Sequence, residues 1–446
     1  MKHKCPLFFG LGLLLLLINS SWSWADRNTP YRQPINLKDR CMEVLTKALH
    51  EPSPMHRVWA LEALGEIGVK ETIPLVVGAL QDHDSSVRSY AAEVLGRMGD
   101  KEVIQHLALA LQDSHWHVRS LAAKALGKIG DQAISPILMK TINEDEDWHV
   151  RTFAIEALGE LGDISAIPHL KNYLVDPDLL IRIYAAEALG KFGDQSGMPI
   201  ILEALNDPDW DIRRYGAVPL GGIAKKWAIP PLIKALEDPD WCVRLCVAEA
   251  LGKIGDEKTI PHLGNLLSDE EEAVRGYAIE ALGQIGDKAA VPFLSRALED
   301  TQGVVRRRAA KALGQMGGPS AVSLLIKALK DPDADVRREA SASLGQIGNR
   351  SALPYLKKLQ KDSDPSVRVQ TAGAMRKLGD CSGTTILRNL LDDTDWRIRL
   401  QAIAALTDDR NKSVIPFVEK GLRDPKIQVR IYTAKLIWLI QEVESK

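Results

Sequence analysis

Arginine returns at a nearly constant interval along almost the whole chain, and this regularity is the strongest constraint on its fold. The arginines are Arg57, Arg88, Arg119, Arg151, Arg182, Arg213, Arg244, Arg275, Arg306, Arg337, Arg368, Arg399 and Arg430. Eleven of the twelve intervals are 31 residues long and one is 32, and an Asp stands six positions before each arginine except the first, where it is Glu51. Such a period indicates a repeat array, in which each unit packs on its neighbours. We number the units 1 to 13 by these arginines.

Each unit is predicted to contain two helices. Around Arg244, apolar residues fall at positions −1, +3, +4 and +7 relative to the arginine, which is one face of a helix from about −3 to +10. Asp240 is placed to cap its N-terminus and Gly255 to end it in the left-handed conformation. A shorter helix follows, as at 290–298, where Pro292 fits only the first turn. Equivalent N-caps are Asp147, Asp178, Asp209, Asp333 and Asp395.

These units predict an all-α superhelical solenoid of about thirteen two-helix repeats over residues 36–443. Positions +3 and +4 are mostly Ala, which lets helices of adjacent units approach closely. With neighbouring helices roughly 8–10 Å apart, the array forms a curved ribbon on the order of 120 Å along its spine. The last helix ends after Trp438-Leu439-Ile440 in polar residues, which is typical of a terminal cap.

Two units depart from the pattern. Unit 6 carries Pro219 inside its longer helix, together with Gly216 and Gly222, so we expect a kink or a change of curvature there. Unit 12 replaces the usual helix ending with residues 407–411, Thr-Asp-Asp-Arg-Asn.

The repeated motif resembles a known family. Residues 238–256 read Asp-Pro-Asp-Trp-Cys-Val-Arg-Leu-Cys-Val-Ala-Glu-Ala-Leu-Gly-Lys-Ile-Gly-Asp. This pattern is similar to the HEAT-like repeats first described in phycobilin lyases, and the likeness covers roughly residues 36–443. The resemblance implies that the longer helices line a concave groove. It also implies that each turn Asp pairs with an Arg of its own or a neighbouring unit.

The Asp and Arg positions are interpreted as an architectural ladder. Thirteen copies favour a structural role, because a binding site would use only a few. The central members of this ladder are Asp238, Arg244, Asp269, Arg275, Asp300 and Arg306.

Two related kinds of enzyme provide alternatives. Resemblance to deoxyhypusine hydroxylases would imply iron-binding His-Glu pairs at positions +1 and +2, but no unit has one there, and the pair His50-Glu51 lies outside that register. A lyase-like enzyme or a chromophore chaperone related to the phycobilin lyases stays open as the runner-up. We therefore expect a protein that is not an enzyme, with no catalytic residues and no cofactor.

Four histidines fall in the turns of units 2 to 4. Imidazoles on neighbouring turns are able to share a metal ion, but no carboxylate or Cys completes a fixed ligand spacing. Solvated turn histidines are the preferred interpretation, so no metal site is predicted. The four are His83, His115, His117 and His149.

Aromatic residues concentrate at positions −3 and +2 of the register, where they border a polar strip formed by positions −2, +1, +5 and +9. Partly exposed aromatics beside charged residues favour protein binding. The alternative is that they fill the seams between units. The strip is acidic at +5 in several units and basic in units 9 and 10, which would orient an extended partner. The groove candidates are Trp116, Trp148, Trp210, Tyr215, Trp241, Tyr277, Arg306, Arg307, Arg308, Arg337 and Arg338.

Residues 1–25 are typical of a secretory signal peptide. Lys2 and Lys4 precede an apolar run from Leu7 to Ile18, and cleavage is expected after Ala25. An uncleaved anchor is the alternative, although twelve apolar residues are short for a span of roughly 20. Residues 26–35 are expected to form a linker. The mature chain would then be periplasmic or extracellular, without stable membrane insertion.

Charge narrows the class of partner. The formal net charge of the whole chain is −2, and removing residues 1–25, which hold two Lys and no acidic residue, leaves −4. A dedicated nucleic-acid binder needs a basic surface, so that class is disfavoured. Together these patterns predict an exported interaction scaffold that binds a protein or peptide in a concave groove.

Overall fold

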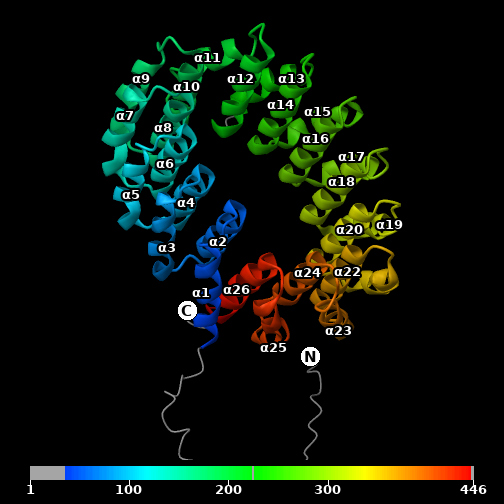
Figure 1. Ribbon diagram of the computed structural model, residues 1–446. Helices are drawn as coiled ribbons and strands as arrows, with labels where there is room; N and C mark the ends of the chain where they lie inside the picture. The colour runs from blue at the N-terminus through cyan, green and yellow to red at the C-terminus, as the bar shows by residue number, and fades with distance from the viewer. Residues whose placement is uncertain (1–35, 224–225, 443–446) are drawn as a thin grey trace, which may run out of the picture.

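The structure is a computed structural model that describes residues 36–223 and 226–442, and all the regular elements in this part are helices (Figure 1). The longer helices form an inner layer: α2 (Pro54–Ile67), α4 (Ser85–Met98), α6 (Trp116–Ile129), α8 (Trp148–Leu161), α10 (Leu179–Lys191), α12 (Trp210–Ile223), α14 (Trp241–Ile254), α16 (Glu272–Ile285), α18 (Gly303–Met316), α20 (Ala334–Ile347), α22 (Pro365–Lys377), α24 (Trp396–Thr407) and α26 (Ile427–Glu442).

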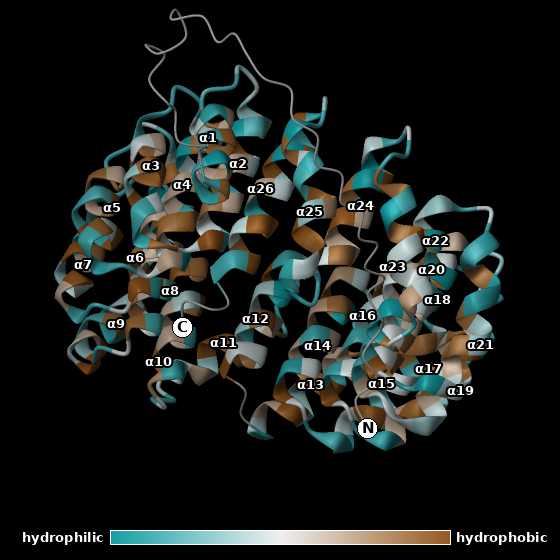
Figure 2. Ribbon diagram, turned by 90° about the horizontal axis from the view of Figure 1, so that it is seen from below, coloured by the Kyte–Doolittle hydropathy of each residue, from teal (hydrophilic) through white to brown (hydrophobic). Residues whose placement is uncertain are grey.

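The outer layer consists mostly of shorter helices: α1 (Leu37–Ala48), α3 (Ile73–Gly78), α5 (Ile104–Ala110), α7 (Ser135–Glu144), α9 (Ile167–Tyr173), α11 (Met198–Ala204), α13 (Ile229–Ala235), α15 (Ile260–Asn265), α17 (Val291–Ala297), α19 (Gly318–Ala328), α21 (Leu353–Leu356), α23 (Cys381–Leu390) and α25 (Ile415–Val418). Hydrophilic residues gather in the turns that join the layers (Figure 2). The predicted solenoid of two-helix units is confirmed. The proposed leader and linker lie outside the described residues.

Local capping follows the sequence closely. The carboxylate of Asp240 accepts a hydrogen bond from the backbone N–H of Cys242 at 2.8 Å, and Gly255 ends the same helix at φ 72°. The other five predicted N-caps accept equivalent bonds. In unit 12, Arg410 follows the end of α24 and adopts a positive φ of 53°, at the position where most other units have the Gly that ends the inner helix.

Close approach of the inner helices depends on a Gly in one unit facing an Ala in the next. A methyl group added to Gly252 would lie 2.8 Å from the Cα of Ala281, closer than real side chains tolerate. Gly216 serves a different contact, because a methyl there would lie 2.6 Å from the backbone nitrogen of Leu205. This glycine lets α12 pack on α11, and α12 continues as one helix through Pro219.

The two ends of the solenoid meet, so the ribbon is a closed ring (Figure 1). The last helix, α26, packs against α1 and α2, and its apolar residues belong to the same core cluster as those of α1. Ion pairs join Lys38 to Glu442 and Arg40 to Glu419. The interpretation of the final helix as a terminal cap is therefore wrong. Its outer face is covered because curvature summed over thirteen units brings the chain ends together.

The apolar core of the ring divides into two clusters. One runs from α1 to α10 and continues across the closure into α22, α24 and α26. The other runs from the remainder of α10 to the remainder of α22. The helices α10 and α22 thus mark two boundaries within the ring.

Candidate functional site

The inner surface of the ring is built from positions −2, +2, +5 and +9. At 100° per residue these positions point within a narrow sector of the inner helix. The sequence interpretation also placed +1 in this strip, and that was wrong for most units, because +1 faces the next inner helix. Examples are Ser120, Ile183 and Val369, which are all buried. The aromatic position +2 consequently lies within the strip rather than at its border.

The predicted ladder exists and links most units to the next. The guanidinium of Arg244 donates to both carboxylate oxygens of Asp269 at 2.7 and 2.8 Å, and to the backbone carbonyl of Asp238 at 2.9 Å. Asp269 also accepts from the N–H of Glu271 in its own turn. The ion pairs are Arg57–Asp82, Arg88–Asp113, Arg119–Asp145, Arg151–Asp176, Arg213–Asp238, Arg244–Asp269, Arg275–Asp300, Arg306–Asp331, Arg337–Asp362 and Arg399–Asp424.

The ladder is interrupted at two junctions within the described part of the chain. Arg182 and Arg368 donate to backbone carbonyls of their own units but make no ion pair with the Asp of the next unit. Both lie on the helices that divide the core. At the first gap Pro219 occupies the position of the Ala that usually faces a Gly of the preceding unit. At the second gap Arg376 occupies the position of that Gly. Bulk at the seam therefore accompanies each missing pair.

The aromatics at +2 are partly covered by neighbouring cations. The guanidinium of Arg308 lies 5.3 Å from the ring centroid of Tyr277, and that of Arg214 lies 4.3 Å from Tyr215. Tyr184 is mostly enclosed, and its burial raises the pKa of its phenol well above the usual range. The +2 aromatics are thus shared between the seam and the inner surface.

The tryptophans at −3 are the first residues of α6, α8, α12, α14 and α24. Because the units repeat, these indoles lie along one rim of the ring. Trp210 and Trp241 are 44% and 42% exposed, among the most exposed large apolar side chains described. Trp116 stacks on His149 of the next unit with 4.5 Å between ring centroids, and Trp148 stacks on the same imidazole with 3.6 Å between centroids.

The predicted basic cluster separates into two groups. Arg306 and Arg337 are ladder members whose guanidiniums are occupied by Asp331 and Asp362. Arg308 pairs with Glu280, and Arg338 pairs with Asp335. Arg307 is half-buried beside them. Of these five arginines, only Arg307 has no ion pair with a described residue.

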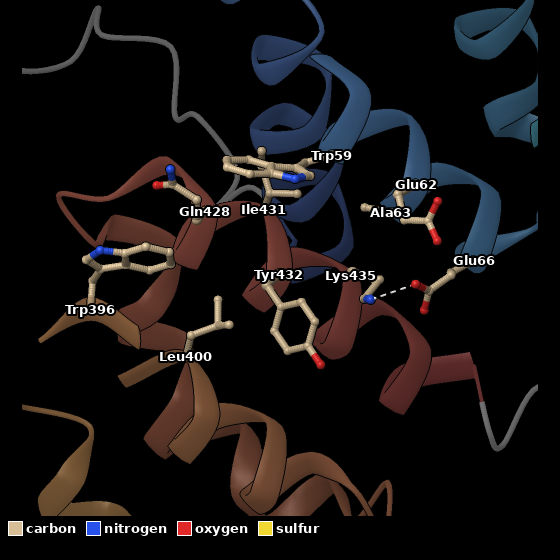
Figure 3. Close-up of a pocket in the computed structure, with 10 residues that line it drawn as sticks. All are labelled: Trp59, Glu62, Ala63, Glu66, Trp396, Leu400, Gln428, Ile431, Tyr432 and Lys435. Atoms are coloured by element: carbon tan, nitrogen blue, oxygen red, sulfur yellow. Dashed lines mark hydrogen bonds and ion pairs between the residues drawn. The ribbon is translucent and has the colours of Figure 1, made fainter. Parts of the chain in front are cut away.

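A pocket of about 370 Å³ opens on the inner surface where the ring closes (Figure 3). Sequence reasoning missed it. The register did place Trp59 and Tyr432 at +2 and Trp396 at −3, but nothing in the pattern indicates that units 12 and 13 adjoin unit 1. The lining residues are Trp59, Glu62, Ala63, Glu66, Trp396, Leu400, Gln428, Ile431, Tyr432 and Lys435.

Clusters of metal-ligating side chains and long apolar helices are two features that the described residues lack. No three His, Cys, Asp or Glu side chains of residues 36–223 and 226–442 gather as a metal-binding group. Burial lowers the pKa of His117, which disfavours its charged form. Of the helices described, none combines the length and apolar character needed to cross a membrane.

Comparison with known proteins identifies the repeat. The sequence profile of HEAT repeats matches residues 42–115, 107–190, 168–223, 198–269, 260–343 and 322–407. The chain belongs to the HEAT-repeat family. No curated protein sequence matches this HEAT-repeat chain at a significant level.

Three solved structures illustrate the likeness. The CpcE–CpcF complex of phycocyanin lyase from Nostoc sp. is 27% identical, over 54% of this chain and 92% of that one, with a TM-score of 0.32. Human deoxyhypusine hydroxylase is 23% identical, over 62% and 96%, with a TM-score of 0.30. Kap95p, solved with RanGDP, is 14% identical, over 91% and 66%, with a TM-score of 0.42.

Proposed function

We propose that this HEAT-repeat ring is an exported scaffold, not an enzyme, that binds an extended polypeptide along its inner surface. The carrying observation is the exposure of Trp210, Val218 and Trp241 on the neighbouring inner helices α12 and α14. Trp210 and Trp241 begin α12 and α14 at the rim, and Val218 lies on the inner surface two turns further along α12. Exposed large apolar side chains on neighbouring helices are typical of interaction sites. Arg214 lies on the same helix α12, where it pairs with Asp211 and lies over the ring of Tyr215, so this helix combines an indole with a guanidinium. Trp and Arg are enriched among residues that dominate binding energy.

The charge along the inner surface supports an oriented partner. Glu156 and Glu249 lie in units 4 and 7, whereas Arg307, Arg308 and Lys311 lie in unit 9. A polypeptide with basic residues toward units 4 to 7 and acidic residues toward unit 9 complements this gradient.

The experiment begins with affinity capture from an envelope extract and identification of the partner by mass spectrometry. The affinity of the purified partner is then measured for single variants whose helical circular dichroism is unchanged. Trp241→Ala and Arg307→Glu are expected to weaken binding by more than about 1 kcal/mol, whereas Gln370→Ala in unit 11 serves as the control. If no inner-surface variant changes the affinity for the partner, the proposal is contradicted and the binding site lies on the outer helices or in the turns.

Export is tested separately. N-terminal sequencing of the native protein is expected to begin at Asp26. An intact Met1 on a protein recovered from the cytoplasm would contradict export without bearing on the scaffold.

A further inference from the structure

The pocket at the closure is assembled from both ends of the chain. Unit 1 supplies Trp59 from α2, unit 12 supplies Trp396 from α24, and unit 13 supplies Tyr432 from α26 (Figure 3). Leu400 and Ile431 lie between these aromatic side chains. The walls are therefore aromatic and aliphatic, and they face one another only when the ring is closed.

The charged groups of the pocket are already paired. Lys435 donates to Glu66 at 2.9 Å and lies 4.4 Å from the ring centroid of Tyr432. Glu62 accepts from Arg97 at 2.8 Å. Each carboxylate thus has its own cation, and the pocket has no charge left to neutralise. An ion would have to displace one of these pairs, whereas an uncharged molecule would leave both intact.

One polar atom in the wall lacks a partner. The side-chain oxygen of Gln428 is buried and makes no hydrogen bond with a described residue. A buried acceptor without a donor is costly, and a ligand that supplies a donor removes that cost. The volume of about 370 Å³ lies at the small end of the range for small-molecule sites.

We propose that this pocket binds a small, planar, uncharged aromatic molecule that carries one hydrogen-bond donor. The molecule stacks against Trp59, Trp396 and Tyr432, and it donates to Gln428 once the buried amide oxygen turns toward the pocket. Because it touches both chain ends, it binds the closed ring and not the open one. At a free ligand concentration ten times Kd, the closing equilibrium shifts about elevenfold toward the ring. The proposal goes beyond polypeptide binding, which rests on α12 and α14.

The test uses the purified full chain and N-phenyl-1-naphthylamine, an uncharged aromatic amine whose fluorescence rises in apolar surroundings. Trp396→Ala and Trp59→Ala are each expected to raise its Kd at least tenfold. Tyr355→Ala removes an exposed aromatic side chain from the outer helix α21, away from both proposed sites, and is the matched control that leaves Kd unchanged. Probe binding that is lost in the control but kept in both pocket variants would overturn the proposal, and so would equal affinity in all four proteins.

Two further measurements test separately the hydrogen bond to Gln428 and the dependence of binding on ring closure. Indole is expected to displace the probe more strongly than 1-methylindole, which lacks the N–H, and Gln428→Leu removes that difference. Arg40→Glu places like charges beside Glu419 at the closure, outside the pocket, and is expected to weaken probe binding severalfold. The double variant Arg40→Glu with Glu419→Arg restores it. Unaltered affinity in a ring shown by X-ray scattering to be open would contradict the dependence on closure. Failure of these tests leaves polypeptide capture by α12 and α14 unaffected.

Discussion

At the scale of residues, the ladder explains why the same two side chains recur in every unit. Each paired Arg binds its own unit through a backbone carbonyl and the turn of the next unit through a carboxylate, as Arg244 does. A guanidinium presents its N–H groups in a fixed fork that matches both acceptors at once, which an ammonium does not. The motif therefore sets the spacing between units as well as stabilising each turn.

The arginines at the two ladder gaps provide a control for the free energy that an Arg–Asp pair contributes to folding. Arg275→Ala leaves Asp300 without its cation, and we expect the free energy of unfolding to fall by about 3 kcal/mol, because both groups are largely buried. Arg182→Ala removes only bonds to backbone carbonyls, and we expect a loss of about 1 kcal/mol. Chemical denaturation of the two variants measures the difference. Equal losses would show that the carboxylate pair contributes nothing.

Acid is expected to weaken the ladder. Hydrogen bonds from Arg88 and Arg337 hold the pKa of Asp113 and Asp362 below the usual range. A carboxyl with a depressed pKa stabilises the fold fully above its unfolded pKa of about 3.9. That contribution disappears as the pH falls through the lower folded value. The thermal midpoint of Asp113→Asn should therefore differ from that of the native chain at neutral pH, and the difference should shrink as the pH falls below the unfolded pKa of about 3.9. A constant difference at every pH would contradict this.

Sequence reasoning located every ladder residue but not the direction of the pairing. Arg and Asp of one unit are only six positions apart, so the resemblance left pairing within a unit and between units open. The structure selects the next unit because the helix carries the Arg side chain toward the following turn. Because of this ambiguity, Arg306 and Arg337 were also predicted as groove candidates, although their guanidiniums bind the Asp of the next unit.

At the scale of elements, the contact between Gly and Ala controls how closely inner helices pack. Gly252→Ala would force α14 and α16 apart, and we expect destabilisation of about 1–3 kcal/mol. Gly78, in α3, has open space where a methyl would be added and an ordinary helical backbone, so Gly78→Ala should leave stability unchanged or raise it by about 0.5 kcal/mol. Differential scanning calorimetry on both variants checks the contrast. A neutral Gly252→Ala would mean that the seam can relax.

Helix boundaries were predictable because capping chemistry is local. Asp240 and Gly255 need no tertiary information to begin and end α14. The direction in which position +1 faces depends instead on tertiary packing. Ser120 and Ile183 are buried because the next unit lies against them, and a helical wheel drawn for one helix does not contain that neighbour.

At the scale of the whole molecule, the gaps at α10 and α22 divide the ring into two arcs. Neither junction has the ladder pair or the usual contact between Gly and Ala, and the apolar core changes cluster at both. We expect hydrogen exchange at the facing sides of α10 and α12, and of α22 and α24, to be faster than between α14 and α16. Peptide-resolved exchange measures this directly. Uniform protection around the ring would show that the arcs are not separate units.

Closure of the ring was beyond sequence reasoning. Curvature is a sum of small rotations between units, and an error of a few degrees at each of thirteen units decides whether the ends meet. The residues at the closure carry no signal of their own. Arg40 and Glu419 look like ordinary surface charges until α1 and α26 are placed together.

Closure also makes the two chain ends complementary to each other, head to tail. Such a contact is heterologous, since the face on α26 differs from the face on α1 and α2 that receives it. Within one chain the faces are held at an effective concentration of the order of millimolar, so self-pairing prevails in dilute solution. When the closure is weakened and the protein is concentrated, the same faces join different molecules into larger rings or filaments. The contact that closes a single chain is then also the site at which chains link end to end.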